Sequence, residues 1–158
     1  MGRIGTIARF VAGTAALGLG AASADSAPMP NWHTRYSNDG AVVLAVRSDF
    51  APAGGHVRVA VYDDEANFLE NAKAKLDASV NHDGVALVTL DDIKPGDYAF
   101  VAYYDENGDG KLNRNAIGKP KEPFIFSNNV RPKLRKPTFS ETKVAVAPGE
   151  VVVLTLKD

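Results

Sequence analysis

Apolar side chains recur at every second position along much of this chain, and that spacing limits the possible folds more than any other feature. Residues two apart lie on the same face of an extended strand, whereas a helix repeats every three to four residues. The alternation is clear at residues 57–62 and 72–80. The sequence therefore predicts an all-β domain.

The alternating segments are separated by turns rich in glycine, proline and asparagine, which are typical of connected strands. Seven strands are expected, at residues 42–46, 57–62, 72–80, 85–90, 97–104, 142–147 and 151–156. We interpret Asn81 to Gly84 as a hairpin turn, and Tyr98 as a tyrosine whose hydroxyl bonds back to upstream backbone. About seven such strands predict an immunoglobulin-like or transthyretin-like (prealbumin-like) β-sandwich.

The first 24 residues have the layout of a secretory signal peptide. Arg3 and Arg9 flank a basic start, an apolar run follows from Phe10 to Gly20, and Ala22-Ser23-Ala24 forms a small-residue cleavage site. The run is about half as long as a membrane-spanning helix. We expect cleavage after Ala24, no transmembrane segment in the mature chain, and an exported protein that is periplasmic or secreted.

The mature chain divides into two parts. Residues 25–40 are polar and aperiodic, which predicts a flexible leader anchored by Trp32 and Tyr36. Residues 41–158 predict a single β-sandwich domain. Its strands are interrupted at residues 105–140, where no strand or helix period is visible, and long loops of this kind are usually functional or disordered. The apolar residues within it predict an ordered loop insertion.

Composition excludes several classes of function. The chain has no cysteine, so neither disulfides, thiolate metal sites nor a cysteine nucleophile contribute. Removal of Arg3 and Arg9 leaves 16 of the 18 basic residues against 19 acidic ones, a net charge of −3. Because nucleic-acid binders carry a basic excess, nucleic acid is not expected as a partner.

A calcium-type loop begins at Asp105. Side-chain oxygens at Asp105, Asn107, Asp109 and Asn113 stand at the first, third, fifth and ninth positions. Gly110 at the sixth permits the turn that directs the carbonyl of Lys111 inward. The twelfth position is Ala116 where such loops place glutamate, so we expect Glu122 to complete the site and binding to be weak, with Kd of about 10⁻⁴ to 10⁻³ M. The alternative is a metal-free turn in which Asp and Asn cap their own backbone.

From this loop onward the sequence resembles a secreted bacterial family catalogued as domain of unknown function 2141. The resemblance rests on residues 98–102, 105–112, 117–122, 126–129 and 137–139. It implies export and a small β-sandwich; it indicates no particular activity, because the family has no established one. It also implies that Glu122, Ser127, Asn128 and Asn129 form one local structure with the loop. The chain departs from the family pattern in carrying Asn113 where aspartate is common.

A second candidate surface is a basic strip. Arg131, Lys133 and Arg135 alternate as on one face of an extended segment, and Lys136 follows. Such a strip would suit polyanions, either lipid headgroups or polysaccharide. A solvated loop that balances the acidic turn is the alternative.

Catalysis has little support in the sequence. His33, His56 and His82 lack metal-ligand spacing, and no Gly-x-Ser-x-Gly motif is present. We expect a non-catalytic module whose calcium-type loop orders a recognition surface for an unknown envelope or extracellular component. Polyanion binding through the basic strip is the alternative, and an uncharacterised enzyme is the third possibility.

Overall fold

Eight strands in two sheets make up the part of the chain that the computed structural model describes, residues 40–132 and 135–158. The expected signal peptide, the leader up to residue 39 and Lys133 lie outside these residues. The smaller sheet has the order β4–β1–β8 and the larger the order β3–β2–β5–β6, with β7 also paired to β5. The strands are β1 (Val42–Ser48), β2 (His56–Tyr62), β3 (Ala74–Ser79), β4 (Val85–Leu90), β5 (Gly96–Asp105), β6 (Phe124–Phe126), β7 (Val144–Val146) and β8 (Val151–Leu156).

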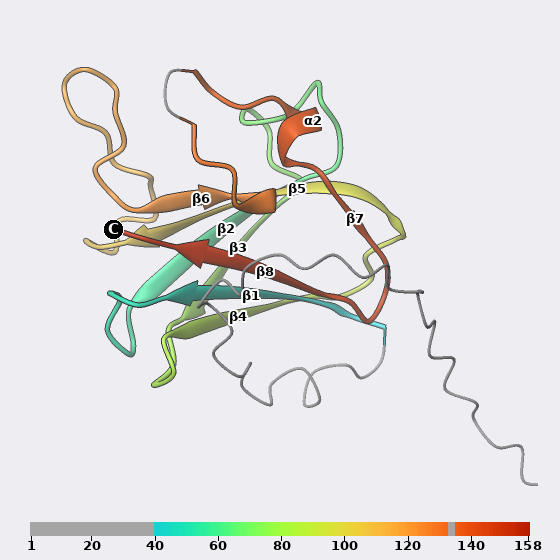
Figure 1. Cartoon of the computed structure of the whole chain (residues 1–158), viewed down its shortest axis with the longest axis horizontal. Helices are drawn as coiled ribbons and strands as arrows, with labels where there is room; N and C mark the ends of the chain where they lie inside the picture. The colour runs from blue at the N-terminus through green and yellow to red at the C-terminus, as the bar shows by residue number, and fades with distance from the viewer. Residues whose placement is uncertain (1–39, 133–134) are drawn as a thin grey trace, which may run out of the picture. The chain divides into compact units, whose positions relative to one another are not determined.

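Strand β5 organises the larger sheet, as Figure 1 shows. One of its edges pairs with β2 along seven residues. The other edge is shared, because β7 pairs with Gly96–Tyr98 and β6 with Val101–Tyr103. Pairing is antiparallel throughout this sheet, whereas β1 and β8 of the smaller sheet are parallel.

The core lies between the two sheets and contains the residues that the alternation predicts. Every second side chain of β1, β2 and β5 faces inward, and Leu44, Val59 and Phe100 are at most 1 % exposed. Burial of each such side chain stabilises the fold by roughly 1.5–3 kcal/mol. The expected β-sandwich is therefore confirmed at the level of two packed β-sheets.

A second apolar cluster lies on the outer face of the larger sheet. Tyr62, Val101 and Phe126 project outward from the sheet and pack with Phe139 and with Phe68 of the β2–β3 loop. Phe139 opens the short helix α2 (Phe139–Thr142), whose start is fixed by a capping box between Thr138 and Glu141.

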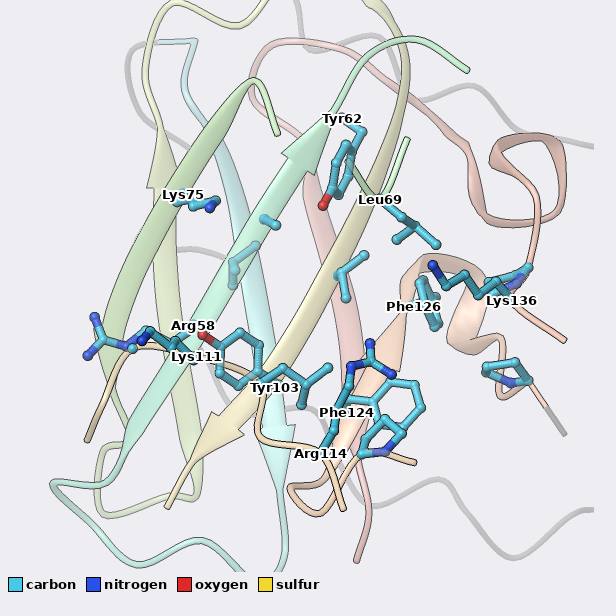
Figure 2. Close-up of a pocket in the computed structure, with 18 of the residues that line it drawn as sticks. Arg58, Tyr62, Leu69, Lys75, Tyr103, Lys111, Arg114, Phe124, Phe126 and Lys136 are labelled. Atoms are coloured by element: carbon cyan, nitrogen blue, oxygen red, sulfur yellow. The ribbon is translucent and has the colours of Figure 1, made fainter. Parts of the chain in front are cut away.

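Part of this outer face forms a groove of about 990 Å³, which Tyr62, Val101 and Phe126 of this cluster also line (Figure 2). Its floor includes Tyr103 of β5 and Phe124 of β6. Residues 110–112, 114 and 118–120 of the β5–β6 connection line one part of its wall, and residues 132 and 135–137 line another. The groove therefore lies directly beside the loop that begins at Asp105.

The seven predicted strands each have a counterpart, and the differences have physical causes. The predicted loop insertion at residues 105–140, in which no strand or helix period is visible, also contains β6, the 3₁₀ helix η1 (Ser127–Asn129) and the start of α2. Three residues are too few for a period to emerge, and β6 forms by adding to the edge of β5. The strand expected at 142–147 is shorter because Thr142 ends α2.

The turn at Asn81 to Gly84 reverses the chain as predicted, with an antiparallel bridge between Val80 and Ala86, but the strands that it connects belong to different sheets. Strand β3 pairs with β2, and β4 pairs with β1, so this turn carries the chain from one sheet to the other. The prediction for Tyr98 is confirmed, since its hydroxyl donates a hydrogen bond to the carbonyl of Lys94 at 3.0 Å.

We expect the Gly84→Ala variant to lose at least about 2 kcal/mol of unfolding free energy. Gly84 has φ 73°, and an added Cβ would lie 2.4 Å from the backbone carbonyl oxygen of Ser48. Gly149→Ala is the matched control, because Gly149 has φ 83° but open space around its Cβ position, so only about 1 kcal/mol should be lost. Urea unfolding measures both, and equal losses would contradict the steric argument.

A candidate cation-binding loop

The loop 105–113 is fastened to the sheet by Asp105, the last residue of β5. The Asp105 side chain is fully buried, and its Oδ2 accepts hydrogen bonds from Arg58 Nε at 3.0 Å and from the Gly110 backbone N–H at 2.8 Å. The hydrogen bond that Arg58 donates to Asp105 is the main cause of the raised pKa of Arg58. Because a buried carboxylate is costly unless it is paired, these contacts fix where the loop leaves the sheet.

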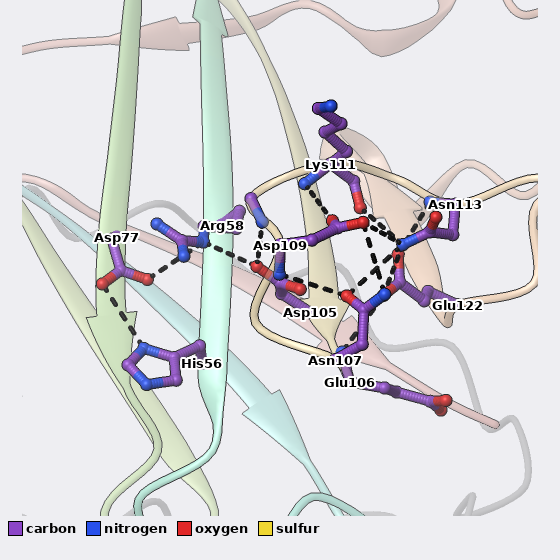
Figure 3. A network of polar contacts seen from close by, with 11 residues as sticks. His56, Arg58, Asp77, Asp105, Glu106, Asn107, Asp109, Lys111, Asn113 and Glu122 are labelled. Carbon is purple, nitrogen blue, oxygen red and sulfur yellow. Dashed lines mark hydrogen bonds and ion pairs between the residues drawn. The ribbon is translucent and has the colours of Figure 1, made fainter.

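The second oxygen of the same carboxylate is different. Asp105 Oδ1 is buried and has no hydrogen-bond partner among the described residues. Figure 3 shows the Asp105 carboxylate between Arg58 on one side and Asn107 on the other. An orphaned buried acceptor is rare in folded proteins and calls for a specific explanation, such as an ion.

Glu122 closes the loop from a distant position in the sequence. Its side chain is 5 % exposed overall; Oε1 accepts from the Glu106 backbone N–H at 3.1 Å, and Oε2 accepts from the Asn113 backbone N–H at 2.8 Å. One carboxylate thus joins the start of the loop to its end. The predicted association of Glu122 with the loop is therefore observed, although Ala116 occupies the twelfth position.

Four oxygens surround the side-chain amide nitrogen of Asn113. They are Asn107 Oδ1 at 3.4 Å, Asp109 Oδ2 at 3.1 Å, the Lys111 carbonyl at 3.4 Å and Glu122 Oε1 at 3.5 Å. An amide nitrogen carries only two hydrogens, so it cannot donate well to all four. Four of the oxygens predicted to be cation ligands, those of Asn107, Asp109, Lys111 and Glu122, therefore converge on one point, which a partially positive NH₂ group occupies (Figure 3).

The loop also retains its negative charge. The pKa of Asp109 is lowered, mainly by the hydrogen bond from Asn113 and then by that from the Lys111 backbone N–H. Among the described residues, no three or more His, Cys, Asp or Glu side chains are grouped closely enough to hold a metal. A cation here would therefore depend on amide and backbone carbonyl oxygens as well as on carboxylates, as hard cations such as Ca²⁺ do.

Sequence reasoning missed Arg58, which is central to this site. Arg58 lies on β2, 47 positions before Asp105, and its Nε is also 3.4 Å from Asp77 Oδ1. His56 Nδ1 is 3.5 Å from the other oxygen of Asp77. No local pattern marks these residues, because only the β2–β5 and β2–β3 registers bring them together.

The residues Ser127, Asn128 and Asn129 do not join the loop, contrary to what the family resemblance implied. Ser127 Oγ accepts from the Phe100 backbone N–H at 2.9 Å and donates to the carbonyl of Thr142. Asn128 donates to Lys143, and Asn129 accepts from Thr155. These side chains instead join η1 to β5, to the end of α2 and to β8.

The basic strip is divided between different contacts. Arg131 donates to the carbonyl of Thr155 at 3.2 Å, and Arg135 forms a bidentate ion pair with Glu141 at 2.6 and 2.8 Å. The pair with Arg135 is the main cause of a Glu141 pKa lowered to about 2. Lys136 lines the groove, and Lys133 lies outside the described residues.

Comparison with known families identifies the chain. The profile of a family described as "Uncharacterized protein conserved in bacteria (DUF2141)" matches residues 48–153. The chain belongs to the DUF2141 family. The match confirms the resemblance seen in the sequence, and in this DUF2141 protein it spans Arg58, the loop 105–113 and Glu122.

Other comparisons give little further information about this DUF2141 domain. No curated protein matches it. The solved structures similar to it include the major plantain pollen allergen Pla l 1, with 9 % identity, a TM-score of 0.36, and coverage of 74 % of this chain and 93 % of the allergen. A family 15 glucoamylase from Hypocrea jecorina has 11 % identity, the same TM-score, and coverage of 76 % and 18 %. The described residues include no helix long and apolar enough to cross a membrane.

Replacing Arg58 with methionine should lower the unfolding free energy by about 2 kcal/mol. The change leaves the buried Asp105 carboxylate without its charged partner, which destabilises the folded state. Because the Arg58 side chain is itself 30 % exposed, the loss of stability should be smaller than for a fully buried pair. Lys75→Met, on the neighbouring strand, is the control and should stay within about 0.5 kcal/mol of the parent. Chemical denaturation provides the measurement. An Arg58→Met variant with the same unfolding free energy as the parent would show that the ion pair does not hold the loop.

Proposed function

We propose that this DUF2141 domain is an exported, non-catalytic β-sandwich module whose loop 105–113 binds a Ca²⁺-type cation weakly and so orders the recognition surface beside it. The convergence of four predicted ligand oxygens on the Asn113 amide carries the proposal. Asn107, Asp109 and Asn113 would contribute side-chain oxygens, Lys111 its carbonyl, and Asp105 and Glu122 carboxylate oxygens.

The number of available oxygens supports a hard cation. Rotation of the Asn113 amide by about 180° would bring its own oxygen to the point that its nitrogen occupies, since the two ends of an amide have nearly the same shape. Asp105 Oδ1 is a further oxygen that no donor satisfies. Together with the four converging oxygens these reach the lower end of the six to eight that Ca²⁺ takes.

The remaining parts of the proposal come from the sequence. The signal-peptide pattern of residues 1–24 supports export to the periplasm or beyond. Strand number and alternation support a transthyretin-like or immunoglobulin-like version of the two-sheet fold. The non-catalytic assignment is supported by the sequence, which has no Gly-x-Ser-x-Gly motif and no metal-ligand spacing among its histidines.

Calcium should raise the melting temperature of the protein by roughly 3–5 °C when it is present at about ten times its Kd. Such an excess stabilises the folded state by about 1.4 kcal/mol, and that free energy corresponds to this shift for a chain of about this size. Thermal unfolding in millimolar CaCl₂, in MgCl₂ at equal ionic strength, and in chelator measures the effect.

Two variants make this measurement specific. Asp109→Asn removes one exposed carboxylate of the loop and should abolish most of the calcium-dependent shift. Asp83→Asn removes an exposed carboxylate from the turn at 81–84 and should leave the shift unchanged. No shift in the parent protein, or an equal shift in the Asp109→Asn variant, would contradict the cation site.

Asn113→Asp should have opposite effects with and without calcium. Without the ion, the variant loses the amide donor that links Asn107, Asp109 and Glu122, and it adds a negative charge among carboxylates, so it should be less stable than the parent. With the ion, the added carboxylate should tighten calcium binding by about tenfold or more. Melting in chelator tests the loss of stability, and calorimetric titration tests the calcium affinity. Weaker calcium binding by the variant would contradict the proposal that residue 113 is a calcium ligand.

A further inference from the structure

The groove on the outer face of the larger sheet combines an aromatic floor with a basic rim. Tyr103 and Phe124 lie on its floor, and Tyr62, Leu69 and Phe126 line its far end (Figure 2). Its volume of about 990 Å³ is at the upper end of the range for small-molecule sites. The two loops that wall it distinguish it from a flat surface.

The charge of the groove opposes that of the whole protein. Its lining contains seven basic residues and one acidic residue, Asp77, whereas the mature chain has a net charge of −3. Carboxylates neutralise two of the seven, because Arg58 pairs with Asp105 and Asp77, and Arg135 pairs with Glu141.

The remaining cations are available to a ligand. Within residues 40–132 and 135–158, no ion pair is formed by Lys75, Lys111, Lys119 or Lys136, and Arg114 bonds to the carbonyl of Gly118. In Figure 2, Lys75 and Lys111 stand on one side of Tyr103, whereas Lys136 reaches in from the opposite side and Arg114 lies beside Phe124. The basic groups thus surround the aromatic floor.

We propose that this groove binds an amphiphilic anion, in which an apolar chain or ring covers Tyr103 and Phe124 and a phosphate, sulfate or carboxylate group is held by the surrounding lysines. An apolar floor alone would accept neutral hydrocarbon, and a basic rim alone would accept any polyanion. Only a ligand with both properties satisfies both surfaces. The binding of such an anion does not require a cation in the loop 105–113. Lys111 takes part in both sites, with its carbonyl in the loop and as a lining residue of the groove.

Decyl phosphate, below its micellar concentration, is a suitable probe for calorimetric titration of the purified protein in chelator. We expect saturable binding of one molecule per chain. Inorganic phosphate supplies the anion without the chain, and decyl maltoside supplies the chain without the charge. Each should bind at least tenfold more weakly than decyl phosphate, and equal binding of either compound would overturn the proposal.

The double variant Lys75→Glu/Lys119→Glu should weaken decyl phosphate binding by at least tenfold. Both side chains are exposed and lie outside the loop 105–113, so the calcium-dependent melting shift should persist in this variant. Lys94→Glu/Lys157→Glu changes the net charge equally at exposed sites away from the groove and should bind as the parent does. If both double variants bound decyl phosphate equally weakly, the weakening would come from the change in net charge alone, and the groove assignment would be overturned.

Vesicles of phosphatidylglycerol distinguish a groove from a membrane surface. The walls on both sides of the floor exclude a planar bilayer, so we expect monomeric decyl phosphate to bind more tightly than the vesicle surface does. Binding to vesicles without binding to decyl phosphate would overturn the proposal, and it would leave the cation site to be tested separately by melting.

Discussion

The buried carboxylate of Asp105 is the constraint on which the functional end of this domain depends. It stands at the last position of β5, and the low-polarity surroundings make its charge costly unless partners approach it. Arg58 from the adjacent strand and the backbone of Gly110 provide those partners. The point where the chain leaves the sheet and the path of its first turn are therefore set by one carboxylate and its two partners.

Glu122 supplies the matching constraint where the chain returns. Its two oxygens hold Glu106 and Asn113, so the loop is closed before the chain reaches β6. The backbone N–H of Tyr104 then donates to the carbonyl of Pro123, and β6 continues along the edge of β5. Because the carboxylates of Asp105 and Glu122 fix both ends of the loop 105–113, the β5–β6 connection begins as an ordered loop and ends in position to form β6.

Negative and positive groups lie on opposite sides of the loop 105–113. The oxygens of the loop 105–113 turn toward a common point, whereas the side chain of Lys111 lines the groove, where lysines from three other segments also lie. An electronegative loop and an electropositive groove thereby share a wall. A change in the conformation of the loop would reposition part of that wall, which gives a physical route by which ion binding would influence recognition.

The positions of seven of the eight described strands were largely predictable from the sequence, because the alternation that defines a strand is a property of neighbouring residues. The spacing of oxygens in residues 105–113 was predictable for the same reason, and so was the turn at Gly110. Strand β6 was not, since three residues contain no period and acquire their conformation only from the edge of β5. The placement of β3 and β4 in different sheets was likewise invisible, because a turn sequence does not specify which strands its neighbours will pair with.

The pairing of Arg58 with Asp105 and the basic rim around Tyr103 emerged only from the folded chain. Their members are separated by tens of residues, and they meet because β2 and β5 share one register and because two loops fold over the same face of the sheet. Sequence patterns report local geometry, whereas a buried ion pair or a groove requires the long-range packing that tertiary structure alone specifies.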